Sequence, residues 1–432
     1  MTEQVADQTL IVDPSIIVIF GITGDLAQRK LLPALYRLIK AGLIHKNTQI
    51  VGITRRDVDV DQLLKPALDD IKADAGAVDG PTLARLKRII HMHRMSMVDE
   101  ADYGSLQELM DQLEEREGLC LTRLFYLAIP PQIIQPVVGR LGSSGLNKGC
   151  RRHNSAARLL LEKPFGFDSV TAQELITATT QYFSEEQIFR IDHYLAKETV
   201  QNIITFRFNN PVFEPLWGLH QIRSVEVVAD EKIGIEGRAN FYEQTGALRD
   251  LIQSHLLHVM SVVMMAKPVN PLQPAAIHKA RLELLESIKP VPADAVGQQT
   301  VRGQYQSYRR EVDNPSSNVE TFAALKLFSK DPSWKDVPII LRTGKGLKHK
   351  QTLVNIDFKP TADDGDHANR LSFQIQPNEG INISLWVKKP GFVHQLQTVD
   401  MSFTYQQAFT GDINPDAYER VLVDAIRGDN TL

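Results

Sequence analysis

The sequence predicts two domains of different architecture. The first is a Rossmann-like, doubly wound parallel sheet (α/β), and the second is an α+β domain with a large, mostly antiparallel sheet covered by helices on one face. Up to residue 192, continuous apolar runs alternate with helical patterns, as in strands buried on both faces. After residue 209, runs of period-two alternation follow one another with few helices between them. Because 432 residues exceed one ordinary core, we place the domains at 1–192 and 193–432.

Composition narrows the class of protein. A hydrophobic content of 43% and a charged content of 23% are typical of a soluble globular chain, and a net charge of −4 gives no general attraction to nucleic acid. No apolar run is long enough for a membrane span, and the polar, acidic residues 1–13 differ from a signal peptide. With only Cys120 and Cys150, we expect a reducing, cytoplasmic location and no disulfide framework.

A glycine turn follows the first predicted strand, residues 15–20. The segment Gly21-Ile22-Thr23-Gly24-Asp25-Leu26-Ala27 leads into a helix predicted over 26–40. Strand, glycine turn and helix in this order favour dinucleotide binding over a turn that only joins two elements. Gly21 permits the tight turn, and Gly24 lets a pyrophosphate approach the backbone at the helix N-terminus.

The second predicted strand, residues 49–53, runs into Arg55 and Arg56. An NAD site usually has a carboxylate near this strand end, whereas arginine suits the 2′-phosphate of NADP. We therefore favour NADP as the cofactor. We choose Arg55 as the phosphate contact and leave Arg56 open, since one or both could be solvated.

Later strands supply further candidates. His91 and His93 alternate in a strand predicted within 88–95. An H-x-H pair could ligate a metal, but no third ligand is nearby. We therefore interpret both as ordinary strand residues and expect no metal site. Pro130 closes a strand over 124–129, and Lys163 follows one over 157–161. Ligands of open parallel sheets bind at the carboxyl ends of strands, where both residues lie.

Four polar residues gather between residues 190 and 198, namely Asp192, His193, Tyr194 and Lys197. If a helix starts near Tyr194, then His193 and Lys197 share one face of its first turn, which favours phosphate binding. The alternative is that Asp192 is only an N-cap and that the others are solvated surface.

The second half contains polar groups between apolar elements. His255 lies in an apolar helix predicted over 247–265, where a satisfied core histidine is the usual explanation. Asp250, in the same helix, and Glu231 fit either a sugar site or a plain domain interface. Lys345 and Lys350 lie in a basic turn that is either solvated or contacts an anionic substrate. We expect helices on one face of the sheet and a dimer contact on the other.

Taken together, these motifs resemble the glucose-6-phosphate dehydrogenase family. The resemblance runs from about Ile16 to the C-terminus. The stretches that carry it are 21–30, 126–131, 162–166, 190–198, 236–238, 249–250, 376–379 and 416–420.

The resemblance implies oxidation of glucose 6-phosphate at C1 to the lactone, with reduction of NADP. His255 matches the family's general base, and Asp192 matches the carboxylate that orients its imidazole. The other implied substrate-binding residues are His193, Tyr194 and Lys197 for the phosphate, Glu231 and Asp250 for sugar hydroxyls, and Lys163, Lys345 and Lys350. The implied cofactor-binding residues are Gly21, Thr23, Gly24, Asp25, Leu26, Arg55, Pro130 and Lys163.

The chain departs from the family pattern at three places. Ser254 stands where the family usually has Asn, and Ala196 where it usually has Gly. The match also stops short of the family's usual C-terminal end, so we expect no second, structural NADP site. The shorter end makes a catalytically impaired, NADP-binding member the alternative to an active enzyme. A different sugar oxidoreductase, related to glucose–fructose oxidoreductase, is a further alternative. We expect a homodimer or homotetramer.

Overall fold

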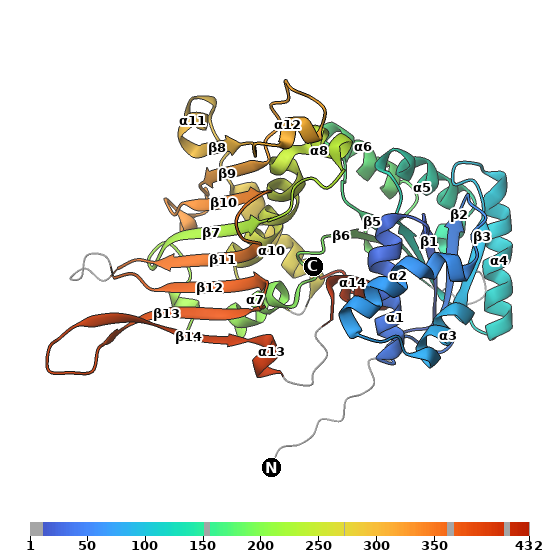
Figure 1. The fold of residues 1–432 in the computed structure, drawn as a ribbon, viewed down its shortest axis with the longest axis horizontal. Helices are drawn as coiled ribbons and strands as arrows, with labels where there is room; N and C mark the ends of the chain where they lie inside the picture. The colour runs from blue at the N-terminus through green and yellow to red at the C-terminus, as the bar shows by residue number, and fades with distance from the viewer. Residues whose placement is uncertain (1–11, 151–155, 272, 361–366, 410–414, 432) are drawn as a thin grey trace, which may run out of the picture. The chain divides into compact units, whose positions relative to one another are not determined.

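The computed structural model describes residues 12–150, 156–271, 273–360, 367–409 and 415–431, so the polar stretch 1–11 lies outside it. These residues form two compact units (Figure 1). The first comprises the chain up to His193 together with 415–430, and the second begins at Tyr194 and continues to 414. The expected domains were contiguous, 1–192 and 193–432. The difference is the C-terminal helix, which packs on the core of the first unit.

The first unit contains a six-stranded, fully parallel sheet in the order β3-β2-β1-β4-β5-β6. Its strands are β1 (Ser15–Phe20), β2 (Gln49–Thr54), β3 (Ile90–Arg94), β4 (Thr122–Leu127), β5 (Ala157–Glu162) and β6 (Ile188–Ile191). All residues of β1 and β2 are buried, because helices cover both faces of the sheet. This explains the uninterrupted apolar runs and confirms the doubly wound prediction.

Two apolar cores lie on opposite faces of this sheet, one containing residues of α1, α2, α3 and α14, the other residues of α4, α5 and α6. The helices are η1 (Ala27–Leu31), α1 (Leu32–Lys40), α2 (Val60–Ala75), α3 (Gly80–Ile89), α4 (Ala101–Glu117), α5 (Ile134–Ser143), α6 (Ser169–Thr180) and α14 (Ala417–Arg427). Short turns of helix are η2 (Pro131–Ile133), η3 (Leu146–Lys148) and η4 (Glu185–Gln187).

Helix α14 belongs to the first unit because of its packing and its end contacts. Leu422, Ala425 and Ile426 are buried in the same core as α1. Glu419 forms an ion pair with Arg37, and the Arg158 guanidinium donates hydrogen bonds to the last carbonyls of the helix. A cation at a helix C-terminus is favourable because it opposes the helix dipole.

The second unit contains an eight-stranded sheet in the order β14-β13-β12-β11-β7-β10-β9-β8, in which only the β7–β10 pair is parallel (Figure 1). Its strands are β7 (Ile222–Asp230), β8 (Thr300–Gly303), β9 (Phe322–Leu327), β10 (Ile339–Gly344), β11 (Gln351–Phe358), β12 (Arg370–Gln376), β13 (Gly380–Lys388) and β14 (Leu396–Thr404). The prediction of a large, mostly antiparallel sheet is confirmed.

Apolar residues of α7, η6, α9 and α10 pack on one face of this sheet. The helices are α7 (Glu198–Asn209), α8 (Ala239–Ala247), η6 (Leu248–Leu256), α9 (Leu257–Met264), α10 (Pro274–Ser287), α11 (Val296–Gln299), α12 (Tyr308–Glu311) and α13 (Tyr405–Ala408). Short turns of helix are η5 (Glu214–Leu216), η7 (Ala293–Ala295) and η8 (Pro332–Trp334).

One disulfide joins Cys120 to Cys150, whose Cα atoms are 5.7 Å apart. We had not expected a disulfide. The two cysteines precede β4 and β5, which are adjacent parallel strands, so residues distant in the sequence enter the sheet side by side. Among the residues that the structure describes, no helix combines the length and hydrophobicity needed to span a bilayer.

Candidate functional site

The glycine turn after β1 fits closely against the turn after β4. Gly21 has a φ of 81°, and a Cβ atom on it would lie 2.4 Å from the carbonyl oxygen of Ala128. Gly24 donates its N–H to the Gly21 carbonyl at 2.8 Å. A side chain at residue 21 would therefore collide with backbone, and the glycine keeps the start of the following helix open to a ligand.

Five candidate residues of the first unit follow strands whose carboxyl ends meet at one edge of the sheet. Arg55 follows β2 and is exposed, Pro130 follows β4, Lys163 follows β5, and Asp192 and His193 follow β6. The strand order reverses between β1 and β4, and dinucleotides bind in the crevice at such a reversal.

The remaining predicted residues of the turn differ in exposure. Asp25 is exposed and forms an ion pair with Arg29 at 2.7 Å, whereas Thr23 and Leu26 are half-buried. One carboxylate oxygen of Asp25 thus pairs with Arg29, and the side chain remains largely exposed.

The predicted strand histidines make polar contacts within the first unit. His91 Nε2 lies 2.9 Å from the amide oxygen of Gln49, and His93 Nε2 lies 3.1 Å from the Ser105 hydroxyl. Burial lowers the pKa of both imidazoles. Both rings thus have side-chain hydrogen-bond partners in the sheet.

Glu162 is a residue of this edge that our sequence reasoning missed. The Tyr126 hydroxyl donates a hydrogen bond to it from the adjacent strand β4. The pKa of the Glu162 carboxyl is raised to about 7, mainly by burial; the Tyr126 hydrogen bond and Lys163 lower it, and the nearby Asp192 carboxylate raises it. The available signal was a glutamate directly before Lys163 at a strand's carboxyl end.

His193 has an aromatic neighbour from α14. Its ring stacks on Tyr418 with the centroids 6.4 Å apart and the planes 12° from parallel. Burial and the Glu162 carboxylate raise the pKa of the Tyr418 hydroxyl, which keeps Tyr418 neutral. The C-terminal helix therefore sets the surroundings of a predicted phosphate-binding residue.

In the second unit, residues 194–197 form turns, and α7 begins at Glu198 with Lys197 as its N-cap. A helix start near Tyr194, the premise of our one-face argument, is therefore wrong. Turn hydrogen bonds replace helical ones here, for example from the Lys197 N–H to the Tyr194 carbonyl at 3.2 Å. Lys197 still marks a helix N-terminus, and its Nζ lies 3.9 Å from a carboxylate oxygen of Glu379.

His255 is 1% exposed and stacks on Tyr194, with ring centroids 4.4 Å apart and planes 24° from parallel. It lies in η6, a π-helical segment in which hydrogen bonds run between residues five apart. This geometry brings Asp250, five residues earlier, closer to the face of His255 than an α-helix would. A period of 3.6 residues would place Asp250 only partly on that face. π-Helical turns often occur at functional sites.

Glu231 and Lys345 follow the parallel strands β7 and β10 and form an ion pair. Lys345 is 3% exposed, and its Nζ lies 5.5 Å from the centre of the Tyr242 ring. Burial, followed by the carboxylates of Asp250 and Glu231, raises the pKa of the Tyr242 hydroxyl. These four residues therefore form one polar cluster with one buried cation, two carboxylates and one phenol. Tyr242 was not predicted from the sequence.

Lys350 is exposed at the residue before β11, outside this cluster as the structure describes it. Asp192 belongs to the first unit and His255 to the second, so their partnership remains a prediction. Each unit thus contributes part of the predicted set: the first carries the nucleotide turn, and the second carries the imidazole and the Glu231–Lys345 cluster.

Comparisons with known proteins agree on one family. Residues 18–202 match the family model "Glucose-6-phosphate dehydrogenase, NAD binding domain", and residues 204–432 match "Glucose-6-phosphate dehydrogenase, C-terminal domain". The first unit is therefore a nicotinamide dinucleotide-binding domain. The chain is 36% identical to glucose-6-phosphate 1-dehydrogenase of Mycolicibacterium smegmatis, over 98% of this chain and 87% of that protein. It is 35% identical to the Bacillus subtilis protein of the same name, over 96% and 87%.

Solved structures give the same result. A glucose-6-phosphate dehydrogenase in complex with glucose 6-phosphate superimposes with a TM-score of 0.90 at 31% identity, over 98% of this chain and 88% of that chain. The glucose-6-phosphate 1-dehydrogenase of Mycobacterium avium gives a TM-score of 0.81 at 30% identity, over 97% and 88%. These matches confirm the resemblance inferred from the motifs, and the chain belongs to the glucose-6-phosphate dehydrogenase family.

Proposed function

We propose that this protein oxidises glucose 6-phosphate to 6-phosphoglucono-1,5-lactone and reduces NADP. The observation that carries the proposal is the Glu231–Lys345–Asp250–Tyr242 cluster in the unit that bears His255, within a chain whose relatives are glucose-6-phosphate 1-dehydrogenases. A buried cation with flanking carboxylates can bond several hydroxyl groups at once, as a sugar requires.

His255 acts as the general base in this proposal. It takes the proton from the C1 hydroxyl while the C1–H bond breaks and the C1=O bond of the lactone forms. Stacking on Tyr194 and burial in η6 hold the imidazole in one orientation. Asp192 is the partner carboxylate that we assign to stabilise the protonated ring. A dinucleotide held by the glycine turn of the first unit would supply the hydride acceptor for C1.

The residues of the first unit fit a dinucleotide. The glycine turn leaves room that a Cβ atom at residue 21 would fill, and it opens a helix start toward the pyrophosphate. Exposed Arg55 follows β2, where a 2′-phosphate is recognised, which supports NADP rather than NAD. Lys163 and Pro130 follow the neighbouring strands on the same edge, and Thr23, Asp25 and Leu26 complete the turn.

Substrate phosphate and hydroxyl groups are assigned to residues of both units. We assign the phosphate to His193, Tyr194 and Lys197, since a helix N-terminus and a lysine meet at residue 197. We assign sugar hydroxyls to Glu231 and Asp250. Lys163, Lys345 and exposed Lys350 are assigned to the substrate as well.

The assay follows NADPH absorbance with glucose 6-phosphate, glucose and other sugar phosphates. We expect the wild-type protein to turn over glucose 6-phosphate. His255→Ala is expected to abolish this turnover, and Asp192→Asn is expected to reduce it strongly. KM should change little, because both residues act on the reacting bond. Turnover of unphosphorylated sugars alone would favour a different sugar oxidoreductase. Cofactor binding without turnover would favour the catalytically impaired alternative, which the comparisons do not support.

The cofactor assignment has its own test. Arg55→Ala is expected to weaken NADP binding by about tenfold to a hundredfold, the value of one charge-assisted phosphate contact, and to leave NAD binding nearly unchanged. Arg56→Ala is the matched control. Equal weakening of NADP and NAD by Arg55→Ala would show that Arg55 is not the phosphate contact.

We also infer that the protein is a homodimer or homotetramer. Polar cross-strand pairs such as Asp357–Arg370 occupy the sheet face on which we expected the contact. Exposed apolar side chains are instead found on the edge strand β14, where Val399, Met401 and Phe403 alternate. Light scattering of wild type and Met401→Glu tests this inference; an unchanged mass in the variant would remove β14 from the contact.

A cytoplasmic location completes the proposal, because phosphorylated sugars and dinucleotides are highly charged and do not cross membranes unaided. The Cys120–Cys150 disulfide argues in the opposite direction. Fractionation of cells that produce the protein tests this location: recovery in the cytoplasmic fraction is expected, and recovery only outside the cytoplasm would refute it.

A further inference from the structure

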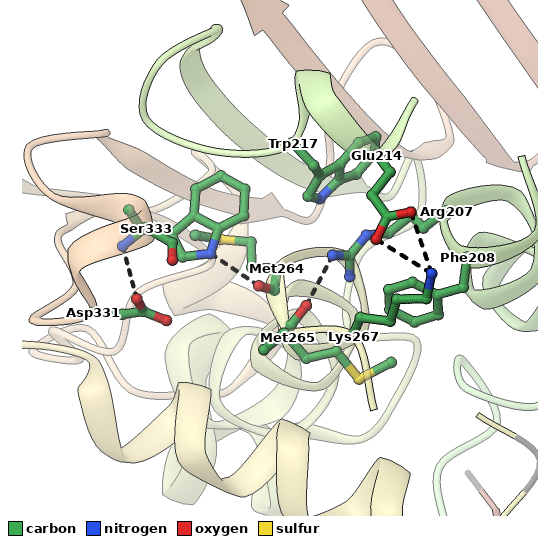
Figure 2. Close-up of a pocket in the computed structure, with 11 residues that line it drawn as sticks. Arg207, Phe208, Glu214, Trp217, Met264, Met265, Lys267, Asp331 and Ser333 are labelled. Atoms are coloured by element: carbon green, nitrogen blue, oxygen red, sulfur yellow. Dashed lines mark hydrogen bonds and ion pairs between the residues drawn. The ribbon is translucent and has the colours of Figure 1, made fainter. Parts of the chain in front are cut away.

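A pocket lies in the second unit, between the C-terminal part of α7, the end of α9 and the short helix η8 (Figure 2). Its volume is about 250 Å³, the space of roughly eight water molecules. Aromatic and methionine side chains form about half of its wall, and charged and polar side chains form most of the rest. The residues that matter for its chemistry are Arg207, Phe208, Trp217, Met265, Lys267 and Trp334.

The floor of the pocket is the C-terminus of α9, and three side chains bind its last carbonyl groups. The indole N–H of Trp217 donates to Val263 O at 2.8 Å, and that of Trp334 donates to Met264 O at 2.9 Å. Arg207 donates to Val262 O at 3.0 Å and to Met265 O at 2.8 Å. The helix end is therefore capped without a ligand. The single N–H donor of each indole, in Trp217 and in Trp334, is already hydrogen-bonded to a helix carbonyl.

The Arg207 guanidinium has N–H groups that do not bind the helix carbonyls. It is only 7% exposed, and burial lowers the pKa of its guanidinium to about 9. A guanidinium carries five N–H donors, of which two bind the helix carbonyls. Its Nε is buried and has no hydrogen-bond partner among the described residues, and no carboxylate there forms an ion pair with it. The helix dipole supplies only about half a negative charge, so the cation is incompletely neutralised.

The surroundings of this cation suit a flat apolar group. The guanidinium carbon lies 4.6 Å from the centre of the Phe208 ring and 4.9 Å from that of Trp217. At the rim, Lys267 pairs with Glu214 at 3.2 Å, and both side chains are about half exposed (Figure 2). Such a rim pair is worth little in stability, so an incoming anion can replace Glu214 on Lys267 at small cost.

We propose that this pocket binds a small organic carboxylate with a flat apolar body. The carboxylate bonds Arg207, whose guanidinium turns slightly to present its unused donors, and Lys267 at the rim. The apolar body occupies the space between the aromatic and methionine side chains. This site is separate from the residues assigned to the sugar and the dinucleotide, and the proposal does not depend on the proposed function.

The test uses the three tryptophans of the chain as reporters. Trp217 and Trp334 line the pocket, whereas Trp386 lies on β13 and donates to Ala368 O, so it is an internal control. The protein is labelled with 5-fluorotryptophan, and fluorine NMR follows a titration with phenylacetate. The resonances of Trp217 and Trp334 are expected to shift and saturate, while Trp386 stays unchanged. Phenylacetamide has the same shape without the charge and is expected to bind at least about tenfold more weakly.

Substitutions at exposed alanines keep the helix caps and the number of tryptophans unchanged. Ala266→Phe fills the mouth of the pocket and is expected to weaken phenylacetate binding by about tenfold or more, and Ala293→Phe, an exposed alanine outside the pocket, is expected to have no effect. Shifts that do not saturate, equal binding of the neutral amide, or undiminished binding in a folded Ala266→Phe protein would each overturn the proposal.

Discussion

Glu162 is expected to make the stability of the first unit depend on pH near neutrality. Its pKa is about 7 in the folded protein and 4.5 as an ordinary glutamate, so the folded state holds the proton more tightly. The sign follows from linkage: the stabilisation is fully present below pH 4.5 and is lost as the pH rises through 7. A difference of 2.5 pH units corresponds to about 3 kcal/mol, of which about 2.5 kcal/mol is lost between pH 5 and pH 8.

Glu162→Gln replaces the carboxyl by a neutral group of the same shape that still accepts the Tyr126 hydrogen bond. We therefore expect the variant to match wild type at pH 5 and to be more stable than wild type by about 2–3 kcal/mol at pH 8. Two charged neighbours, Lys163 and Asp192, face this carboxyl and act in opposite directions. Burial, the first cause of the shift, therefore sets its sign.

Hydrogen exchange of peptides covering β4 and β5 measures this difference in the first unit alone, which global unfolding of a two-unit chain does not. The free energy of opening is compared for wild type, Glu162→Gln and Glu174→Gln, an exposed control on α6. Parallel pH profiles for wild type and Glu162→Gln would refute the reasoning, because Glu162 would then be ionised throughout. If Glu174→Gln abolished the pH dependence of the opening free energy equally well, the dependence would come from the overall charge of the protein and not from Glu162.

Three further predictions address the turn, the C-terminal helix and the polar cluster. Gly21→Ala is expected to weaken NADPH binding by at least about tenfold in a fluorescence titration, because a Cβ atom at residue 21 meets a backbone oxygen. Gly104→Ala in α4 is the control: its Cβ atom meets no neighbouring atom, so NADPH binding is expected to stay unchanged and the fold to be equally or slightly more stable. Arg37→Met is expected to destabilise the first unit by about 2–3 kcal/mol in hydrogen exchange and to expose α14 to proteolysis, since it leaves Glu419 buried without its cation; full protection of α14 would contradict this. Lys345→Gln is expected to raise KM for glucose 6-phosphate by about tenfold or more and to lower stability by about 1–3 kcal/mol, and an unchanged KM would remove the residue from the substrate site.

The element order of the first unit could be predicted because its signals are local. The β1 segment is a buried apolar run that ends at a glycine, and β4 and β5 are similar apolar runs followed by Pro130 and Lys163. Such runs reflect burial on both faces, which is a property of the segment itself once a parallel sheet forms. The period-two pattern of the antiparallel strands β11 and β12 is likewise a local signal, since one face is buried and the other is polar.

Residues that depend on distant partners were not predictable. The pKa of Glu162 is raised because folding buries its carboxyl, and Tyr242 matters because β7 and β10 bring Glu231 and Lys345 together beside it. The π-helical turn of η6 likewise changes which residues share a face with His255, and no spacing rule based on 3.6 residues gives that result.

The sequence by itself determined the two-part α/β and α+β architecture, the nucleotide turn, the identity of the polar residues and the family. Only the tertiary structure decided that α14 returns to the first unit, that Cys120 and Cys150 are bonded, and which carboxylates and cations share a buried environment. The physical reason is range. Hydrophobic periodicity and turn chemistry act between neighbours along the chain, whereas desolvation and charge pairing act between groups that only folding brings together.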